Sequence, residues 1–391
     1  MRIVHTSDWH AGRIWKRMSR LDELGRCLDS LCQFVESDKI DMVLMTGDVF
    51  DSGSPSAEAE RVVFDVLKRL GRMAPVLVLA GNHDDPKRLE AWGQLAELAN
   101  IQVLGKPRRA DQGGVRIIPS KDGKERAVVA AIPFAPVRDF VSALDLGGDE
   151  GQFKQKWNEG LARVAAMLTS HFRPDTVNIF CTHAHIDGAI LSNSERVVQT
   201  GEQFALNGEQ LPTGAQYIAL GHIHKPQQLP NRFGALYAGS PLQLDFGEEG
   251  DEKSFVVVDV VAGLPPKIER VPYVGALKLF TWRGKLDEVA AAAPALREAG
   301  HVRMLVDLEV PDPDVGRRLR AEVPNAVSIQ VQLPVIEAAS PTRERAGATA
   351  SELYQAYHQK RYGRTPDEGV MKAFNALWEA ADLGGEHGAG A

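Results

Sequence analysis

The sequence predicts an α/β fold built on a largely parallel sheet, and two observations support this prediction. Apolar runs typical of strands alternate with amphipathic helical segments over the first hundred residues, an order that implies crossover connections between parallel strands. In addition, the apolar runs over residues 2–6, 41–45 and 76–80 are each followed closely by acidic, histidine or asparagine side chains. Because ligands of such sheets collect beyond the carboxyl ends of the strands, these side chains predict a functional site.

Length and charge limit the class of protein. The chain has 391 residues, enough for two or three domains, and its hydrophobic fraction of 44% allows a sizeable core. The net charge of −7 argues against a general nucleic-acid-binding surface, which is usually strongly basic. A local basic groove is still compatible with this charge.

The cysteines and the apolar runs indicate the cellular compartment. Three cysteines at irregular positions argue against a disulfide framework and against a thiolate zinc site, and they favour the reducing cytoplasm. Two of them, Cys27 and Cys32, follow a helical period and are predicted to face the core. The amino terminus reads as a strand rather than a signal peptide, and no apolar run approaches the roughly 20 residues that span a bilayer. The sequence therefore predicts a cytoplasmic protein without membrane association.

The first hundred residues carry the strand–helix–strand pattern. The predicted elements are, in order, strand 2–6, helix 21–37, strand 41–45, a helix that includes 62–70, and strand 76–80. The polar residues that follow the three strands are Asp8 and His10, Asp48 and Asp51, and Asn82 and His83.

Residues 101–261 add further strands, two of which end in histidines. The predicted strands are 101–104, 115–119, 127–133, 177–181, 217–220, 236–238 and 255–261, and a helix is predicted over 151–171. His222 and His224 follow strand 217–220, and His183 follows strand 177–181. His185 competes with His183 for the same role. We prefer His183, because it is the first residue able to bind a metal after the strand.

The last third of the chain has a different character. Strands 277–282, 302–309 and 327–333 with helices 286–299 and 314–322 predict a small α+β domain, which has no cluster of Asp, His and Asn and for which no chemistry is expected. Two helices follow, with capping boxes predicted from Thr349 to Glu352 and from Thr365 to Glu368. The predicted organisation is a core domain 1–272 that carries the polar strand ends, a capping domain 273–338, a linker 339–348, a helical segment 349–383 and a disordered tail 384–391.

The polar residues at the strand ends form a set typical of a metal site. The set is Asp8, His10, Asp48, Asn82, His83, His183, His222 and His224. Nitrogen and oxygen donors without thiolate suit Mn, Fe or Zn better than Ca or Mg. A catalytic ion commonly takes three or four protein ligands, so the number of donors predicts two ions that share a bridging carboxylate.

The alternative is that each histidine is an independent surface or core group. We assign five other histidines in this way, namely His5, His171, His301, His358 and His387. For the predicted metal set, the same explanation would require separate coincidences at five strand ends.

The order and spacing of these motifs resemble those of a known family. Asp8-x-His10, Gly47-Asp48-x-x-Asp51, Gly81-Asn82-His83-Asp84, Thr182-His183 and Gly221-His222-x-His224 are similar to the motifs of the calcineurin-like metallophosphoesterases. Within that family, Gly53-Ser54-Pro55, Ser194-Glu195-Arg196 and Gly239-Ser240-Pro241 resemble the SbcD nuclease subunits of bacterial SbcCD complexes. The motif resemblance covers residues 1 to about 250.

The resemblance implies a fold and a ligand assignment. The implied fold is a four-layer αββα sandwich with a small α+β capping domain and C-terminal helices, and the implied cofactor is a pair of divalent ions, usually Mn²⁺. One ion would be held by Asp8, His10 and His224, the other by Asn82, His183 and His222, and Asp48 would bridge them. His83 would be a catalytic residue that stabilises or protonates the leaving oxygen, and Asp51 would orient it.

The activity implied by the resemblance is that of a DNA nuclease subunit that acts in repair and recombination. It would be a 3′–5′ double-strand exonuclease and a single-strand endonuclease. Residues 1–272 would form its nuclease domain. The basic residues Arg13, Lys16, Arg17 and Arg20 directly follow the first motif and are predicted to neutralise DNA phosphates. Trp9 and Trp15 beside them could stack on an unpaired base. The alternative for this stretch is an ordinary loop and helix start.

The chain has no GxxxxGK[ST] motif and so supplies no P-loop of its own. The resemblance implies a separate partner, an SbcC-like ABC-type ATPase with long coiled coils. The last helix is predicted to dock on this partner through Val370, Phe374, Leu377 and Trp378, or else to fold back onto the body. A homodimer within a heterotetramer is implied by family likeness alone. Two alternative functions are compatible with the sequence: a stand-alone metal-dependent phosphodiesterase or phosphatase, and a non-catalytic scaffold that binds DNA ends.

Overall fold

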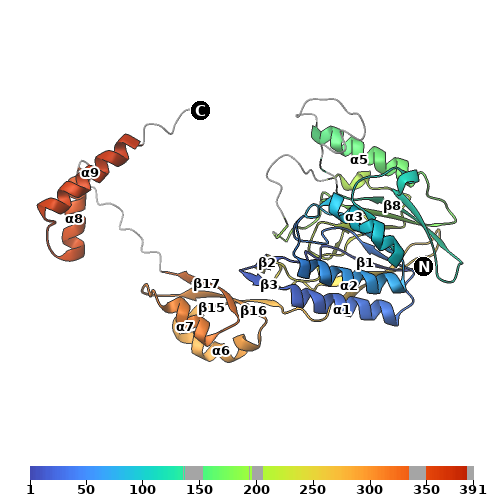
Figure 1. Cartoon of the computed structure of the whole chain (residues 1–391). Coiled ribbons are helices and arrows are strands. Elements are labelled where there is room, and N and C mark those ends of the chain that lie inside the picture. The colour runs from blue at the N-terminus through green and yellow to red at the C-terminus, as the bar shows by residue number, and fades with distance from the viewer. Residues whose placement is uncertain (135, 137–152, 193, 196–205, 334–348, 385–391) are drawn as a thin grey trace. The chain divides into compact units, whose positions relative to one another are not determined.

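The computed structural model of the chain is shown in Figure 1. It describes residues 1–134, 136, 153–192, 194–195, 206–333 and 349–384. Contact clustering divides the chain into two compact units, residues 1–332 and residues 333–391.

A first six-stranded sheet forms one half of the core. Its strands in spatial order are β14 (Lys267–Pro272), β13 (Ser254–Asp259), β1 (Arg2–Thr6), β4 (Met42–Met45), β5 (Val76–Leu79) and β6 (Ile101–Leu104). The four strands β1, β4, β5 and β6 are parallel, β13 pairs with β1 in antiparallel orientation, and β14 pairs with β13 in antiparallel orientation. The prediction of a parallel sheet from the strand–helix order is therefore confirmed.

A second six-stranded sheet has the same mixed character. Its order is β11 (Gln227–Gln228), β12 (Ala235–Tyr237), β10 (Tyr217–Gly221), β9 (Val177–His183), β8 (Arg126–Ile132) and β7 (Val115–Pro119). The central strands β12, β10, β9 and β8 are parallel to one another. The carboxyl ends of β9 and β10 thus lie at the same edge of this sheet.

The two sheets and their covering helices make a four-layer αββα sandwich. Side chains of both sheets, such as Ile3 and Leu44 from one and Val129 and Ile179 from the other, form one apolar cluster between them. Helices α1 (Leu21–Ser37) and α2 (Ala57–Met73) belong to a separate cluster with the outer face of the first sheet. Helix α5 (Phe153–Thr169) packs on the outer face of the second sheet. The implied four-layer fold is confirmed.

Amphipathic periodicity explains the covering helices. The buried positions of α1 include both Cys27 and Cys32, as predicted, and these thiols are free. Helix α2 begins at a Ser56 cap whose side chain accepts the Ala59 amide hydrogen. Helix α3 (Pro86–Ala96) begins with a proline, which suits a first helical turn, and it follows the Asn82–His83 motif directly.

A smaller sheet forms the C-terminal part of the first unit. Strands β15 (Leu279–Lys285), β16 (His301–Asp307) and β17 (Ala326–Gln332) are all parallel, and they share an apolar cluster with helices α6 (Val289–Glu298) and α7 (Val315–Glu322). The predicted α+β segment is therefore present. The domain boundary between residues 272 and 273 stays a prediction, since contact clustering keeps residues 1–332 together.

The second unit contains two helices, α8 (Ala350–Tyr362) and α9 (Glu368–Gly384). The capping box from Thr349 to Glu352 is confirmed. The second predicted cap is wrong: Asp367 Oδ1 accepts the Val370 amide hydrogen at 2.9 Å, so the cap lies two residues beyond Thr365. Asp competes well with Thr for this position, because its carboxylate also interacts favourably with the helix dipole.

Short elements complete the described structure. A hairpin of β2 (Ile14–Trp15) and β3 (Met18–Ser19) was not anticipated from the sequence. The 3₁₀ helices are Glu97–Ala99, Ala110–Gln112, Gly208–Gln210, Phe246–Glu248 and Leu286–Glu288.

Some predicted segments lie outside the described residues. They are the linker 339–348, the tail 384–391 apart from its first residue, and Arg196. None of the helices in the described part of the chain has the length and apolar character that crossing a bilayer requires.

Candidate metal centre

Five strand ends converge to form one buried pocket. The loops after β1 and β4 are joined by hydrogen bonds from the Asp8 amide to the Gly47 carbonyl and from the His10 amide to the Asp48 carbonyl, both 3.0 Å long. Asp8, His10, Asp48 and His222 have positive φ angles of 52°, 46°, 52° and 104°. Non-glycine residues adopt such a conformation at a cost of about 1–3 kcal/mol each, and they cluster at functional sites.

Two glycines allow the loops to approach this closely. A Cβ at Gly81 would lie 2.1 Å from Oδ1 of Asp48, and one at Gly47 would lie 2.2 Å from Nδ1 of His183. Gly47 also has a φ of +104°, which disfavours any side chain there. Both glycines of the Gly47-Asp48 and Gly81-Asn82 motifs are therefore required by packing against the site itself.

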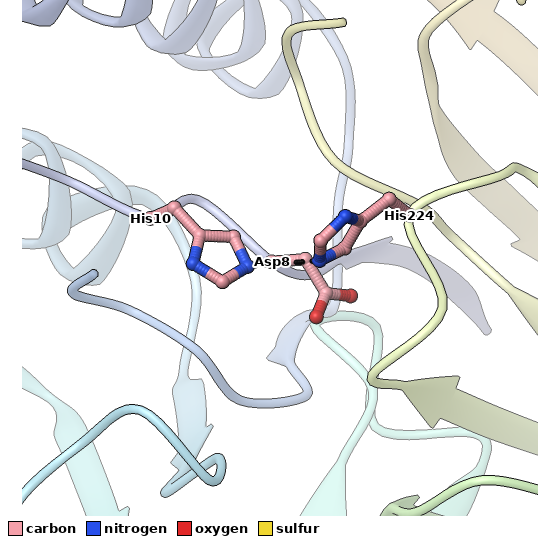
Figure 2. Close-up of side chains that lie close together, drawn as sticks. All are labelled: Asp8, His10 and His224. Carbon is pink, nitrogen blue, oxygen red and sulfur yellow. Dashed lines mark hydrogen bonds between the residues drawn. The ribbon is translucent and has the colours of Figure 1, made fainter. Parts of the chain in front are cut away.

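The first group of donors comes from the first and second sheets together. Asp8, His10 and His224 have ligand atoms within 4.8 Å of one another, and all three side chains are buried. Figure 2 shows the two imidazoles beside the carboxylate. Their ring planes make an angle of 80°, and their Nε2 atoms are 3.0 Å apart. The Asp8 carboxylate also accepts the amide hydrogen of His222 at 3.0 Å, which links this group to the second one.

The second group of donors surrounds the Asn82 side chain. Nε2 of His183 lies 3.0 Å from the Asn82 amide oxygen, and Nδ1 of His222 lies 2.9 Å from the same oxygen. The other ring nitrogen of His183 faces the Thr46 carbonyl at 2.8 Å. This backbone contact places a proton on Nδ1 and leaves the Nε2 lone pair directed into the pocket.

Asp48 lies between the two groups. Its Oδ2 atom is 3.6 Å from Nε2 of His10 and 3.6 Å from Nε2 of His183. Its Oδ1 atom accepts the His83 amide hydrogen at 2.9 Å, which fixes the orientation of the carboxylate. One carboxylate oxygen is therefore equally close to an imidazole of each group.

The burial of the pocket shifts its pKa values. Burial lowers the pKa of His10 to about 4 and also lowers the pKa of His183 and of His222. Burial and the nearby charge of Asp48 raise the pKa of Asp8. Burial acts to raise the pKa of Asp48 as well, but the adjacent imidazoles of His183 and His10 outweigh it and hold that pKa below its usual range.

This donor set fits divalent metal ions. Two carboxylates, those of Asp8 and Asp48, are buried together with imidazoles whose pKa values burial lowers. Ring nitrogens of His10 and His224 lie 3.0 Å apart, and those of His183 and His222 lie 3.0 and 2.9 Å from the Asn82 oxygen. A shared cation would stabilise such close approaches of atoms that can act as ligands. Ligands about 2.0–2.2 Å from a common ion lie roughly 3–4 Å apart, which matches the separations in this pocket.

The structure distinguishes the two candidate histidines after β9. His183 is buried and its Nε2 atom reaches both Asn82 and Asp48. His185 is half-buried, and its ring centroid lies 6.2 Å from that of His222. The geometry favours His183.

His83 lies at the rim of the pocket, where its ring is perpendicular to that of His10 at a centroid distance of 4.6 Å. Its Nδ1 atom is 2.8 Å from the backbone carbonyl of Asp51 and 4.0 Å from the Asp51 carboxylate. Asp51 therefore lies beside His83, and its nearer atom is the backbone carbonyl oxygen. Its role in orienting His83 stays a prediction. The Asp51 carboxylate is closer to His10 Nδ1, at 3.3 Å, and to Arg13, at 3.4 Å.

Part of the predicted DNA-binding stretch is wrong. Trp9 and Trp15 are buried, with exposed fractions of 1% and 4%, so neither offers a face to a base. Arg20 is also buried and pairs with Glu23 at 2.8 Å. In the hairpin, Trp15 points to the interior and Ile14 to solvent, an alternation that composition alone did not reveal. Arg13, Lys16 and Arg17 are at least partly exposed and stay in the predicted set.

Several residues behind the pocket were not predicted from the sequence. Asp84 accepts three amide hydrogens, from Gly81, Val49 and Phe50, and so holds two metal loops together. Glu195 accepts the His224 amide hydrogen at 3.0 Å. Glu248 and Lys253 are buried beside His224. The Ser194-Glu195 pair was the signal available in the sequence, but Glu248 and Lys253 follow no recognisable motif.

Of the five histidines assigned as independent surface or core groups, His5, His301 and His358 have hydrogen-bond partners, and His171 is exposed. His5 is buried between Tyr217 and Thr46, at 2.7 and 2.9 Å, and His301 bonds Glu23 at 2.7 Å. His387 lies outside the described residues.

Comparison with known proteins supplies independent information. A family model described as calcineurin-like phosphoesterase matches residues 1–226. The SbcD subunit of the nuclease SbcCD from Bacillus subtilis is 32% identical, over 96% of this chain and 97% of its own length. The same subunit from Escherichia coli K12 is 28% identical over 99% of this chain and 100% of its own, and that of Rhodobacter capsulatus is 31% identical over 68% of each.

Proposed function

The chain belongs to the calcineurin-like phosphoesterase family, in the branch of the SbcD nuclease subunits, and from this membership we propose how its pocket acts on DNA. It is a metal-dependent phosphodiesterase and a nuclease subunit that binds divalent metal. The proposal adds the identity of the metal, the ligands of each ion, the catalytic residue, the substrate and the docking of the partner.

We propose that the pocket holds two Mn²⁺ ions. Asp8, His10 and His224 would hold one ion, and Asn82, His183 and His222 the other, with Asp48 as the bridge. The observation that carries this assignment is the position of Asp48 Oδ2, 3.6 Å from an imidazole nitrogen of each group. When bound, such a pair of ions supplies a hydroxide nucleophile and neutralises charge on the phosphate.

The chain's own residues perform the remaining steps. His83 donates its Nδ1 hydrogen to the Asp51 carbonyl, so its Nε2 atom is the one free to face a substrate. In its imidazolium form it would donate a proton from Nε2 to the leaving sugar oxygen. Arg13, next to Asp51, and the exposed Lys16 and Arg17 would contact the phosphate backbone near the pocket.

The experiment that tests the nuclease proposal is cleavage of linear double-stranded and of single-stranded DNA by the purified full-length chain with Mn²⁺, with and without EDTA. Cleavage that depends on Mn²⁺ and is stopped by EDTA is expected, with 3′–5′ polarity on duplex ends. The variant His83→Ala should lower turnover by about 10²–10⁴-fold while elemental analysis still finds the metal. His171→Ala, at an exposed histidine far along the chain, is the matched control. An unchanged rate of DNA cleavage by the His83→Ala variant would contradict a catalytic role for His83.

We also propose that α8 and α9 dock on an SbcC-like ATPase in a complex that contains a homodimer of this chain, in the cytoplasm. Phe374 stacks on Tyr354 at 4.1 Å and so joins the two helices. Leu377 and Trp378 are 73% and 52% exposed, and Val370 is 36% exposed. Exposed apolar side chains on one helix are typical of a helix that binds in a groove of a partner.

The docking proposal is tested by co-purification. Deletion of residues 340–391 should abolish co-purification with the ATPase and leave Mn²⁺-dependent nuclease activity in place. The double variant Leu377→Ala/Trp378→Ala should weaken binding, whereas Lys372→Ala, at an exposed polar position of the same helix, should not. Full binding by the deletion variant would contradict the docking role.

A further inference from the structure

His224 contacts two different environments through its two ring nitrogens. Nε2 faces the pocket, 3.0 Å from Nε2 of His10 (Figure 2). Nδ1 lies 2.6 Å from the hydroxyl oxygen of Ser194. Ser194 is not one of the predicted metal ligands. The hydrogen bonds of Ser194 therefore decide which nitrogen of His224 carries the ring proton.

The Ser194 hydroxyl donates to the carboxylate of Glu248. A hydroxyl has a single hydrogen, so Ser194 can only accept from His224, and Nδ1 must carry the hydrogen in that bond. A neutral ring with its proton on Nδ1 has its lone pair on Nε2, the nitrogen that faces the pocket. The carboxylate of Glu248 thus fixes the tautomer of this ring through the Ser194 hydroxyl, and its Oε1 atom also lies 3.4 Å from Nδ1 of His224.

Glu248 is itself held firmly in place. It is fully buried in the 3₁₀ helix Phe246–Glu248, and its second oxygen lies 2.5 Å from Nζ of Lys253 and 3.1 Å from the Leu244 amide nitrogen. Lys253 also donates to the backbone carbonyl of His224 at 2.8 Å. The same ion pair therefore holds both the ring and the backbone of this histidine.

The other half of the pocket is built differently. The Nδ1 atom of His183 faces the Thr46 carbonyl, and a backbone carbonyl can only accept a hydrogen bond. The tautomer of His183 is therefore set by the backbone, which no substitution removes. The tautomer of His224 depends on two side chains, which substitution can remove.

We propose that Glu248, acting through Ser194, is a positioning residue that fixes the tautomer and the ring orientation with which His224 binds its divalent ion. This inference rests on the proposed function, because it concerns a ligand of the same metal pocket. Partners of this kind behind a ligating histidine typically contribute 10–100-fold to metal affinity.

The first test is Mn²⁺ binding by the full-length chain, measured by calorimetric titration. Ser194→Ala removes the acceptor 2.6 Å from Nδ1, leaves the Glu248 carboxylate at its longer distance of 3.4 Å, and keeps the Glu248–Lys253 pair intact. The variant should lower the affinity for one of the two Mn²⁺ ions by about 10–100-fold and leave the affinity for the other unchanged. Ser194→Thr, which restores a hydroxyl, should recover the lost affinity.

A second variant tests Glu248 directly. Glu248→Gln alone leaves Lys253 buried without a counter-charge and can prevent folding, so the pair Glu248→Gln/Lys253→Gln is used. This double variant should lower the affinity for the same Mn²⁺ ion that Ser194→Ala affects. The control is Glu252→Gln, the same change at an exposed glutamate four residues away, which should bind both ions as the unmodified chain does.

The second test reads the tautomer itself by ¹⁵N NMR of the histidine rings in the metal-free chain. His224 should carry its proton on Nδ1 in the unmodified chain and lose this preference in Ser194→Ala. Unchanged affinities together with an unchanged tautomer in Ser194→Ala would overturn the positioning role. An unmodified chain that binds no Mn²⁺ would instead contradict the proposed function, and the NMR result would still decide the tautomer.

Discussion

At the scale of single residues, Gly81 permits the contact on which the bridging position of Asp48 depends. A Cβ at this position would lie 2.1 Å from Oδ1 of Asp48, far inside van der Waals contact. Gly81→Ala should therefore push the carboxylate away by roughly an ångström, and a displacement of that size costs about 10²-fold in rate. The measurement is Mn²⁺ affinity and DNA cleavage by the purified variant.

The control for Gly81→Ala is Gly25→Ala. Gly25 lies inside α1 with no atom within 4 Å of an added Cβ. The alanine should leave metal binding unchanged and stabilise the helix by about 0.5–1 kcal/mol. If Gly81→Ala binds two ions as tightly as Gly25→Ala does, the close packing at Asp48 has no role in the site.

Residue-scale prediction from the sequence worked where a polar side chain directly follows a buried strand. Asp8, Asp48 and His183 follow this pattern, and the structure brings them to one pocket. The pattern gives no information on residues that approach from other parts of the chain. Glu248 reaches His224 through a 3₁₀ helix and a hydroxyl, so only the folded structure reveals it.

At the scale of elements, the β2–β3 hairpin has two basic residues at its turn. Lys16 and Arg17 have φ angles of 49° and 65°, the conformation that hairpin turns usually give to Asn and Gly. The double variant Lys16→Asn/Arg17→Gly suits this backbone and removes both charges. It should keep or slightly raise the free energy of unfolding, by up to about 1 kcal/mol.

The same variant should bind DNA more weakly and with a smaller dependence on salt. Each phosphate contact contributes about 0.9 to the slope of log affinity against log salt concentration, so the slope should fall by about one to two. The charge-matched control is Lys106→Gln/Arg109→Gln in the loop after β6, where Lys106 is partly exposed and Arg109 is exposed. An unchanged slope in the hairpin variant would show that DNA binds elsewhere.

A buried ion pair connects the first helix to the third sheet. Glu23 of α1 lies 2.7 Å from His301 of β16 and 2.8 Å from Arg20, and it accepts the Leu277 amide hydrogen at 3.0 Å. Burial acts to raise the pKa of Glu23, but hydrogen bonds from His301 and Arg20 outweigh it and lower the pKa to about 2. These contacts extend from the core to the predicted capping segment.

The lowered pKa of Glu23 determines how stability changes with pH. A carboxyl group with a lower pKa in the folded state contributes stability above its unfolded pKa, near 4.5, and this contribution is lost as the pH falls toward 2. The shift corresponds to roughly 3 kcal/mol. Glu23→Gln should lower the free energy of unfolding at pH 7 by about this amount and flatten its decline in acid, as measured by urea denaturation.

Asp22→Asn is the matched control for Glu23→Gln. Both residues lie in the first turn of α1, so both changes remove the same interaction with the helix dipole, but Asp22 is exposed. The free energy of unfolding of the Asp22→Asn variant should differ from that of the unmodified chain by no more than about 0.5 kcal/mol. Equal effects of the two variants would show that the dipole, and not the contact with His301, determines the stability of this region.

At the scale of the whole molecule, local sequence patterns determine the elements more fully than their arrangement. The strand–helix order predicted parallel strands, and the structure has them in both sheets. The division into two sheets came only from the family resemblance, because it depends on pairings such as β1 with β13, more than 250 positions apart in the chain. Periodicity within a segment carries no information on such long-range pairings.

The central claim is that five strand ends form one pocket for two adjacent ions. The most direct measurement is a crystal structure of the full-length chain with Mn²⁺, in which anomalous scattering locates each ion. The account predicts two peaks about 3.5–4 Å apart with Asp48 between them, one beside His10 and the other beside His183. A single peak, or peaks that do not share Asp48, would contradict it.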